Sequence, residues 1–241
     1  MTAFVLVHGG WHGGWCWRKV TPLLRAAGHE VYTPTLTGLG ERAHLAGPAV
    51  DLGCHVRDVR AVLEAEDLHD VVLVGHSSSG PVITGVAADP DTAARLRRLV
   101  YLDAFVPAAG QSVLDLVPDA RRETFEGLAR EHGDGWRIPL DRDAALSSWC
   151  ITEPADLAWM RPRLVPQPLA TLRQPLERDP VPGIPGSYLH CVRGPMAATF
   201  GRFADEAAAA PARWTVRQLD TGHDAMVTLP RELVELLLAE L

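Results

Sequence analysis

The stretch Val71-Val72-Leu73-Val74-Gly75-His76-Ser77-Ser78-Ser79-Gly80 decides the fold of this 241-residue chain. Its β-branched run predicts a buried strand, and the small residues after it predict a sharp turn into a helix. The turn fits the pattern G-x-S-x-G, which exposes a serine hydroxyl above a sheet on a strained strand-to-helix turn. Ser79 stands where the second glycine is usual, and Gly80 follows it. The pattern favours Ser77 as a nucleophile, and the alternative is a Ser/Gly loop between an ordinary strand and an ordinary helix.

Strands and helices alternate on both sides of this stretch. Asp51 is placed to cap the helix that leads into it, and Gly28 is placed to end an earlier helix. Such alternation predicts a parallel α/β sheet, with ligand chemistry at the carboxyl ends of the strands. The further strands are expected over residues 4–7, 30–34, 99–102, 188–192 and 214–219, and the helices over 17–27, 51–63, 81–88 and 233–238.

The regular alternation stops between residues 107 and 185. Prolines, charges and the tryptophans Trp136, Trp149 and Trp159 replace it there. We interpret 107–185 as a mostly helical lid inserted into a core of 1–106 and 186–241, with the tryptophans in the lid's own core. Lids of this kind exclude water from a site, and their apolar lining commonly sets the shape of the substrate.

Two sequence motifs bear on whether the protein binds a cofactor or a metal. Gly38, Gly40 and Ala43 match G-x-G-x-x-G/A after a strand, but helical periodicity begins only near Asp51, so no helix N-terminus is expected to hold a pyrophosphate. His8 and His12 lie four residues apart, but the glycines around them argue against a helix that would align them on a metal. We therefore expect neither a cofactor nor a metal, and structural hydrogen bonds from both histidines.

The amino-acid composition and charge indicate which kind of substrate or binding partner to expect. The chain is 47% hydrophobic and 22% charged, which allows a full core in one domain. A formal net charge of -7 argues against nucleic acid or an anionic membrane and favours a small organic substrate. Four scattered cysteines without C-x-x-C spacing, and a strand-like N-terminus without a basic leader, predict reduced thiols in a cytoplasmic protein. Exposed lid surface would allow a homodimer.

Four segments carry a resemblance to a known family: His8-Gly9-Gly10-Trp11-His12-Gly13-Gly14-Trp15, Thr37-Gly38-Leu39-Gly40-Glu41-Arg42, Gly75-His76-Ser77 and Gly222-His223-Asp224-Ala225-Met226. With these segments in this order, the chain resembles the α/β-hydrolase superfamily over essentially its whole length. The closest likeness is to the small plant methylesterases and hydroxynitrile lyases and their bacterial relatives. The resemblance implies an α/β-hydrolase fold, a mostly parallel doubly wound sheet with an inserted helical lid.

The resemblance also implies roles for individual residues. Ser77 would be the nucleophile and His223 the general base, which takes the serine proton during attack and returns one to the leaving group. The backbone amides of Gly10 and Ser78 would hold the developing oxyanion.

The third member expected beside Ser77 and His223 is an acidic residue that orients the histidine, and its position departs from the family pattern. In the methylesterase group it lies in a C-T-x-D-like turn, and here that position falls on Gly194. The nearest replacement is Asp103, at the carboxyl end of the strand that follows the helix after Ser77, where other α/β hydrolases place their acid. The rival interpretation makes Asp103 a hydrogen-bonding residue at the lid hinge. Asp224 adjoins His223 in the chain and is expected to point elsewhere.

The expected function is a serine-dependent carboxylic ester hydrolase that acts on a small or aromatic ester, with methyl esters among the candidates, through an acyl-enzyme. A hydroxynitrile lyase is disfavoured, because those lyases carry threonine at the position of Gly9 and lysine at that of Asp224. A cyclase-like tailoring enzyme on a polyketide-like substrate, with His223 as base, stays open. So does a ligand-binding protein that has lost turnover, and covalent labelling of Ser77 would separate these from the esterase.

Overall fold

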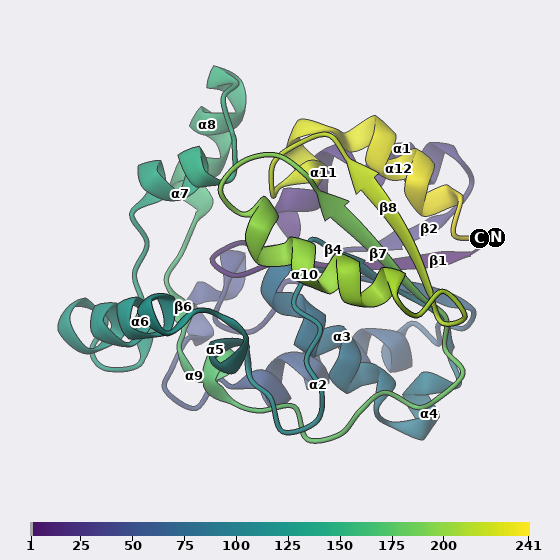
Figure 1. Ribbon diagram of the computed structural model, residues 1–241, viewed down its shortest axis with the longest axis horizontal. Coiled ribbons are helices and arrows are strands. Elements are labelled where there is room, and N and C mark those ends of the chain that lie inside the picture. Colours follow the sequence, from purple (N-terminus) through teal and green to yellow (C-terminus); the bar gives the residue numbers. More distant parts are fainter. Residues whose placement is uncertain (1) are drawn as a thin grey trace.

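A single parallel sheet forms the centre of the computed structural model, which describes residues 2–241 (Figure 1). The order of the six strands is β2-β1-β3-β4-β7-β8. Val7 pairs with Gly75, and His76 pairs with Leu102, which in turn pairs with Leu189. The carboxyl ends of the central strands therefore meet at one edge. The strands are β1 Ala3–Val7, β2 Glu30–Tyr32, β3 Val71–His76, β4 Leu96–Leu102, β7 Gly186–Cys191 and β8 Trp214–Leu219.

Helices cover both faces of the sheet because successive strand residues point to opposite faces. Val5 and Leu73 pack under one set of helices, whereas Phe4 and Val72 pack under the other. The first face is covered by α2 (Leu52–Ala65), α3 (Gly80–Ala87) and α10 (Ala197–Ala208), with the short α4 (Pro90–Ala93) beside them; the second is covered by α1 (Thr21–Ala26), α11 (Ala225–Thr228) and α12 (Pro230–Leu238). The predicted α/β-hydrolase fold, a doubly wound parallel sheet, is confirmed.

Local sequence patterns predicted several helix boundaries correctly. The Asp51 side chain accepts a hydrogen bond from the backbone N–H of Cys54 at 2.8 Å, as expected of an N-cap. Gly28 follows α1 with a φ of +88°, a conformation that costs glycine little. The helix expected over 17–27 is divided, since a 3₁₀ helix (Gly14–Lys19) precedes α1. No helix was expected in the loop between residue 34 and Asp51, and this was wrong, because Gly40–Leu45 forms a 3₁₀ helix. That helix begins at Gly40, so no helix N-terminus lies at Ala43, as predicted.

The segment 107–185 leaves the sheet after β4 and returns at β7. Figure 1 shows its α6, α7 and α8 beyond the sheet, on the side toward which the arrowheads of β7 and β8 point. Trp149 is buried, whereas Trp136 and Trp159 are half-buried. The segment holds α5 (Val113–Leu116), α6 (Asp119–His132), α7 (Arg142–Ser148), α8 (Pro154–Met160), a 3₁₀ turn (Arg161–Arg163) and α9 (Ala170–Arg173), with a two-stranded antiparallel sheet of β5 (Arg137–Ile138) and β6 (Gln167–Pro168).

Two features bear on the predicted location of the protein. All four cysteines are free, with Cys16 and Cys191 buried and Cys54 and Cys150 partly exposed. Within residues 2–241, no helix combines the length and apolar character that crossing a membrane requires. The cytoplasmic location stays a prediction.

Candidate active site

Ser77 stands at the end of β3 on a strained turn. Its φ is +56°, and such a conformation in a residue other than glycine costs on the order of 1–3 kcal/mol. Close packing holds the turn in place: the Ser77 carbonyl accepts a hydrogen bond from Phe105 N at 3.1 Å, and a Cβ on Gly80 would overlap the Phe105 carbonyl. Ser79, in place of the usual glycine, donates its hydroxyl to the carbonyl of His8. The serine thus ties the turn to the glycine-rich loop after β1.

His223 and Asp103 form a buried hydrogen bond. His223 lies in the loop between β8 and α11, and Asp103 follows β4 with a φ of +42°. The distance from His223 Nδ1 to Asp103 Oδ2 is 2.6 Å, and Phe200 stacks on the imidazole at 4.8 Å between ring centroids. A proton on Nδ1 leaves Nε2 able to accept one. No described residue hydrogen-bonds to the Ser77 hydroxyl, and a serine–histidine contact of this kind often tightens only when substrate binds.

Asp103 has two further partners on its other oxygen. Oδ1 accepts from His190 Nδ1 at 3.2 Å and from the backbone N–H of Cys191 at 3.1 Å. Burial favours a higher pKa for the Asp103 carboxyl, but the hydrogen bonds from His190 and His223 outweigh it and hold the pKa below its usual value. Asp103 is therefore a carboxylate that faces two imidazoles. His190 was not predicted as a site residue, because in the sequence it only forms part of an expected strand.

Gly194 offers no side chain and has no room for one. Its φ is +81°, and a Cβ there would overlap the Sγ of Cys150 from the 107–185 segment. The position at which the resemblance would put an acid is thus filled by a sulfur atom from another part of the chain.

The glycine loop after β1 lies against the serine turn. A Cβ on Gly10 would be 3.3 Å from the Ser78 Oγ, so the two residues expected to provide oxyanion donors are neighbours. His8 donates from Nδ1 to the Gly9 carbonyl at 2.9 Å and accepts from Leu36 N at Nε2 at 3.0 Å. Burial lowers the pKa of His8 to about 3, so the ring is neutral. Both histidines of this loop make structural hydrogen bonds, as expected.

A second buried group of polar side chains adjoins His223, and two of its members, His12 and His76, also line the cavity above Ser77. His12 Nδ1 donates to the Gly10 carbonyl at 2.7 Å, and its Nε2 lies 3.2 Å from Asp224 Oδ2. His76 Nε2 donates to the His223 carbonyl at 3.1 Å. One atom each of His76, His223 and Asp224 lies within 4.8 Å of the others, close enough to ligate an ion. Such an ion would occupy a ring nitrogen of His223 that is either bonded to Asp103 or free for proton transfer, so we assign no metal there.

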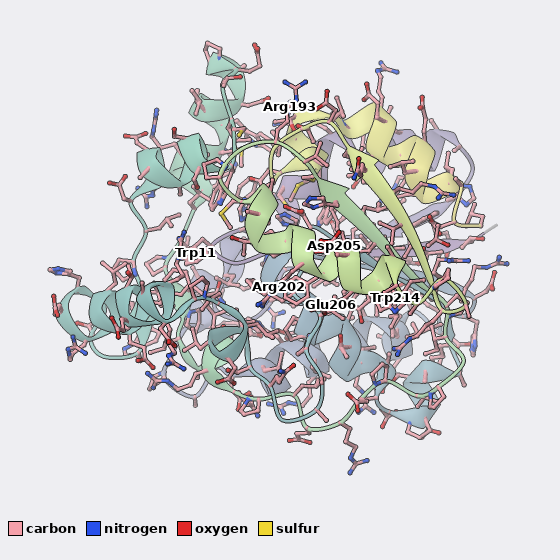
Figure 2. All side chains as sticks on the ribbon, in the orientation of Figure 1. Trp11, Arg193, Arg202, Asp205, Glu206 and Trp214 are labelled. Atoms are coloured by element: carbon pink, nitrogen blue, oxygen red, sulfur yellow. The ribbon has the colours of Figure 1, made fainter. Side chains whose placement is uncertain are left out.

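A cavity of about 470 Å³ opens above Ser77 and His223. This volume suits a small organic molecule. Trp11, labelled in Figure 2, contributes to its wall. It joins the core to the 107–185 segment, because its Nε1 donates to the Ile138 carbonyl at 3.1 Å and its ring lies 5.7 Å from that of Phe125. Most of the remaining lining is apolar and comes from the same segment, including Val113, Val117, Phe125, Leu128, Leu140 and Trp149.

Comparisons with known proteins agree with this architecture. The model of the "Alpha/beta hydrolase family" matches residues 4–236. A carbendazim hydrolyzing esterase from Nocardioides sp. (strain SG-4G) is 43% identical in an alignment of 245 positions that covers 99% of each chain. Methylesterase 9 from Arabidopsis thaliana is 37% identical over 108 residues, which cover 44% of this chain and 41% of the plant protein. An extracellular alpha/beta-hydrolase from a Paenibacillus species superposes with a TM-score of 0.81 at 26% identity, covering 100% of this chain and 99% of that one.

Proposed function

The chain belongs to the alpha/beta hydrolase family and is an esterase-like enzyme, and we propose that it hydrolyses carboxylic esters through an acyl-enzyme on Ser77. The observation that carries this proposal is the buried hydrogen bond of 2.6 Å between His223 and Asp103. His223 lines the same cavity as Ser77, which stands on a strained turn. A neutral imidazole in that orientation can act as a base at its free nitrogen.

In the proposed reaction, Ser77 Oγ attacks the ester carbonyl while His223 Nε2 takes the hydroxyl proton. Asp103 stabilises the imidazolium that forms and does not itself take the proton. The amides of Gly10 and Ser78 bind the oxyanion, and one such donor contributes about 3 kcal/mol of transition-state stabilisation. Collapse of the tetrahedral intermediate releases the alcohol, which receives the proton from His223. Water then attacks the acyl-enzyme by the same route, and the acid and free Ser77 are regenerated.

The cavity supports a small or aromatic ester as the substrate. Its apolar lining would desolvate an aromatic or short aliphatic group, and the polar groups at its base would bind the ester itself. One relative is named for hydrolysis of carbendazim and another is named a methylesterase. Carbendazim and methyl esters of aromatic acids are therefore the first substrates to assay.

A hydroxynitrile lyase reaction is not supported. A Cβ on Gly9 would lie 2.8 Å from His76 Nδ1 and 2.9 Å from Ser77 Cβ, so the threonine that those lyases carry has no room. Asp224 occupies the position at which those lyases carry lysine, and its side chain is fully buried.

The proposal is tested by treating the protein with a fluorophosphonate, followed by intact-mass analysis and peptide mapping. We expect one adduct, on Ser77, and turnover of at least one aryl or methyl ester. Ser77→Ala should lose both while keeping its circular dichroism spectrum and melting temperature. Ester turnover that survives in Ser77→Ala would overturn the serine mechanism. Ligand binding by an unaltered protein that is neither labelled nor active would point to a binding protein instead.

A further inference from the structure

The peptide units on both sides of Gly10 are held by buried side chains. His8 binds the carbonyl of the preceding unit, which carries the Gly10 N–H. In the following unit, the Gly10 carbonyl accepts from His12 at 2.7 Å, and the Trp11 N–H donates to Gln167 Oε1 at 2.9 Å. Gly10 has no Cβ to limit its dihedral angles. These contacts therefore restrict the direction of its N–H.

His12 is held as an imidazolium by its partners. Both of its ring nitrogens face groups that can only accept, the Gly10 carbonyl and the Asp224 carboxylate, so both must carry a proton. Burial alone would lower the pKa of His12, but the charge of Asp224 raises it above the ordinary value. Burial would likewise raise the pKa of Asp224, but the charge of His12 lowers it to about 2. Each group thus keeps the other charged.

The pair also connects two parts of the site that are distant in the sequence. His12 lies in the loop after β1, whereas Asp224 directly follows His223. The His12 ring is further enclosed by Trp15 at 5.4 Å and Trp149 at 4.9 Å between centroids. A shift of the glycine loop relative to His223 would break a contact inside this enclosed cluster.

On the basis of the proposed function, we propose that Asp224 and His12 are positioning residues that hold the Gly10 amide in the direction required of an oxyanion donor. Neither side chain is assigned a contact with the reacting atoms. They act through the Gly10–Trp11 peptide, whose carbonyl His12 binds. Because misplacement by about 1 Å can cost on the order of 10²-fold in rate, loss of this hydrogen bond should lower kcat much more than it raises KM.

A test of this role must avoid leaving a buried charge without a partner. Replacing His12 alone would isolate the Asp224 carboxylate, which can prevent folding. The double variant His12→Phe/Asp224→Asn removes the donor to Gly10 together with the charge, and a phenyl ring suits the two neighbouring tryptophans. The matched control is His55→Phe, because His55 is also buried and binds a backbone carbonyl, that of Thr37 at 3.0 Å, outside the catalytic cavity.

The experiment compares kcat, KM, the rate of Ser77 labelling by a fluorophosphonate, and the melting temperature for the unaltered protein, the double variant and the control. We expect the double variant to lose at least tenfold in kcat and in labelling rate, with KM changed less than threefold. Asp224→Asn alone retains a hydrogen-bond partner for His12 and should keep at least tenfold more kcat than the double variant. The control should lose stability but keep its kcat.

The outcomes separate the two proposals. If the unaltered protein shows neither labelling nor turnover, the proposed function fails. If it shows both, and the folded double variant loses less than tenfold in kcat, the positioning role is refuted and the pair only stabilises the fold. An equal loss in His55→Phe would also refute it, because the effect would then follow from stability.

Discussion

Replacement of Asp103 by asparagine should nearly abolish catalysis without unfolding the protein. Oδ1 of Asp103 accepts two hydrogen bonds, from His190 and the Cys191 N–H, whereas Oδ2 accepts one, from His223. An amide has only one acceptor oxygen. The orientation that keeps more hydrogen bonds puts this oxygen toward His190 and Cys191, and turns the NH₂ group toward His223 Nδ1.

That orientation forces His223 into the wrong tautomer. Nδ1 must then accept, so the ring proton moves to Nε2, the nitrogen that should take the proton of Ser77. We expect kcat to fall on the order of 10⁴-fold, which corresponds to about 5.5 kcal/mol of transition-state stabilisation. Binding of substrate should change little, because Asp103 is not part of the cavity wall.

The assay measures kcat and KM for an aryl ester, with the melting temperature as a check on folding. Asp220→Asn serves as the control, because Asp220 is exposed and pairs with Arg193 at the surface. A folded Asp103→Asn variant with less than a tenfold loss of kcat would refute the assignment of Asp103 as the acid. It would leave Asp103 as a hydrogen-bonding residue at the point where the 107–185 segment begins.

Two further predictions follow from buried neighbours of the site. Adding Gly194→Asp to the asparagine variant should not restore activity, because the backbone there has a φ of +81° and a Cβ would overlap a cysteine sulfur; more than tenfold recovery of kcat would contradict this. Stability should fall as the pH falls from 7 to 5, since burial lowers the pKa of His8 and of His76 to about 3. Below pH 6.5 the unfolded chain binds protons that the folded chain does not, so the two histidines together should lower the free energy of unfolding by roughly 4 kcal/mol. Urea unfolding at both pH values measures this, and equal stability at pH 7 and 5 would refute it.

Features that depend on neighbours in the chain were predictable from the sequence alone. The β-branched run before Ser77, the capping side chain of Asp51 and Gly28 after α1 each act within a few residues, and each lies where it was expected. Alternation of strands and helices was enough to predict a doubly wound parallel sheet, because a parallel connection needs a crossover helix. The 3₁₀ helix Gly40–Leu45 was missed because so short an element leaves no apolar period to detect.

Contacts between distant segments were decided by the tertiary structure. From the sequence, Asp103 was a candidate for the acid, but a hydrogen-bonding role at the lid hinge was equally well supported. The two could not be separated because the hydrogen bond from Asp103 to His223 spans 120 residues. His190 and the His12–Asp224 pair had no local signal at all, and the second of these contacts spans 212 residues. Parallel strands bring their carboxyl ends to one edge whatever their order in the chain. Side chains that are far apart in the sequence, with no regular spacing between them, therefore meet at that edge. Because they are buried there, each charged group needs a hydrogen-bonding or oppositely charged partner.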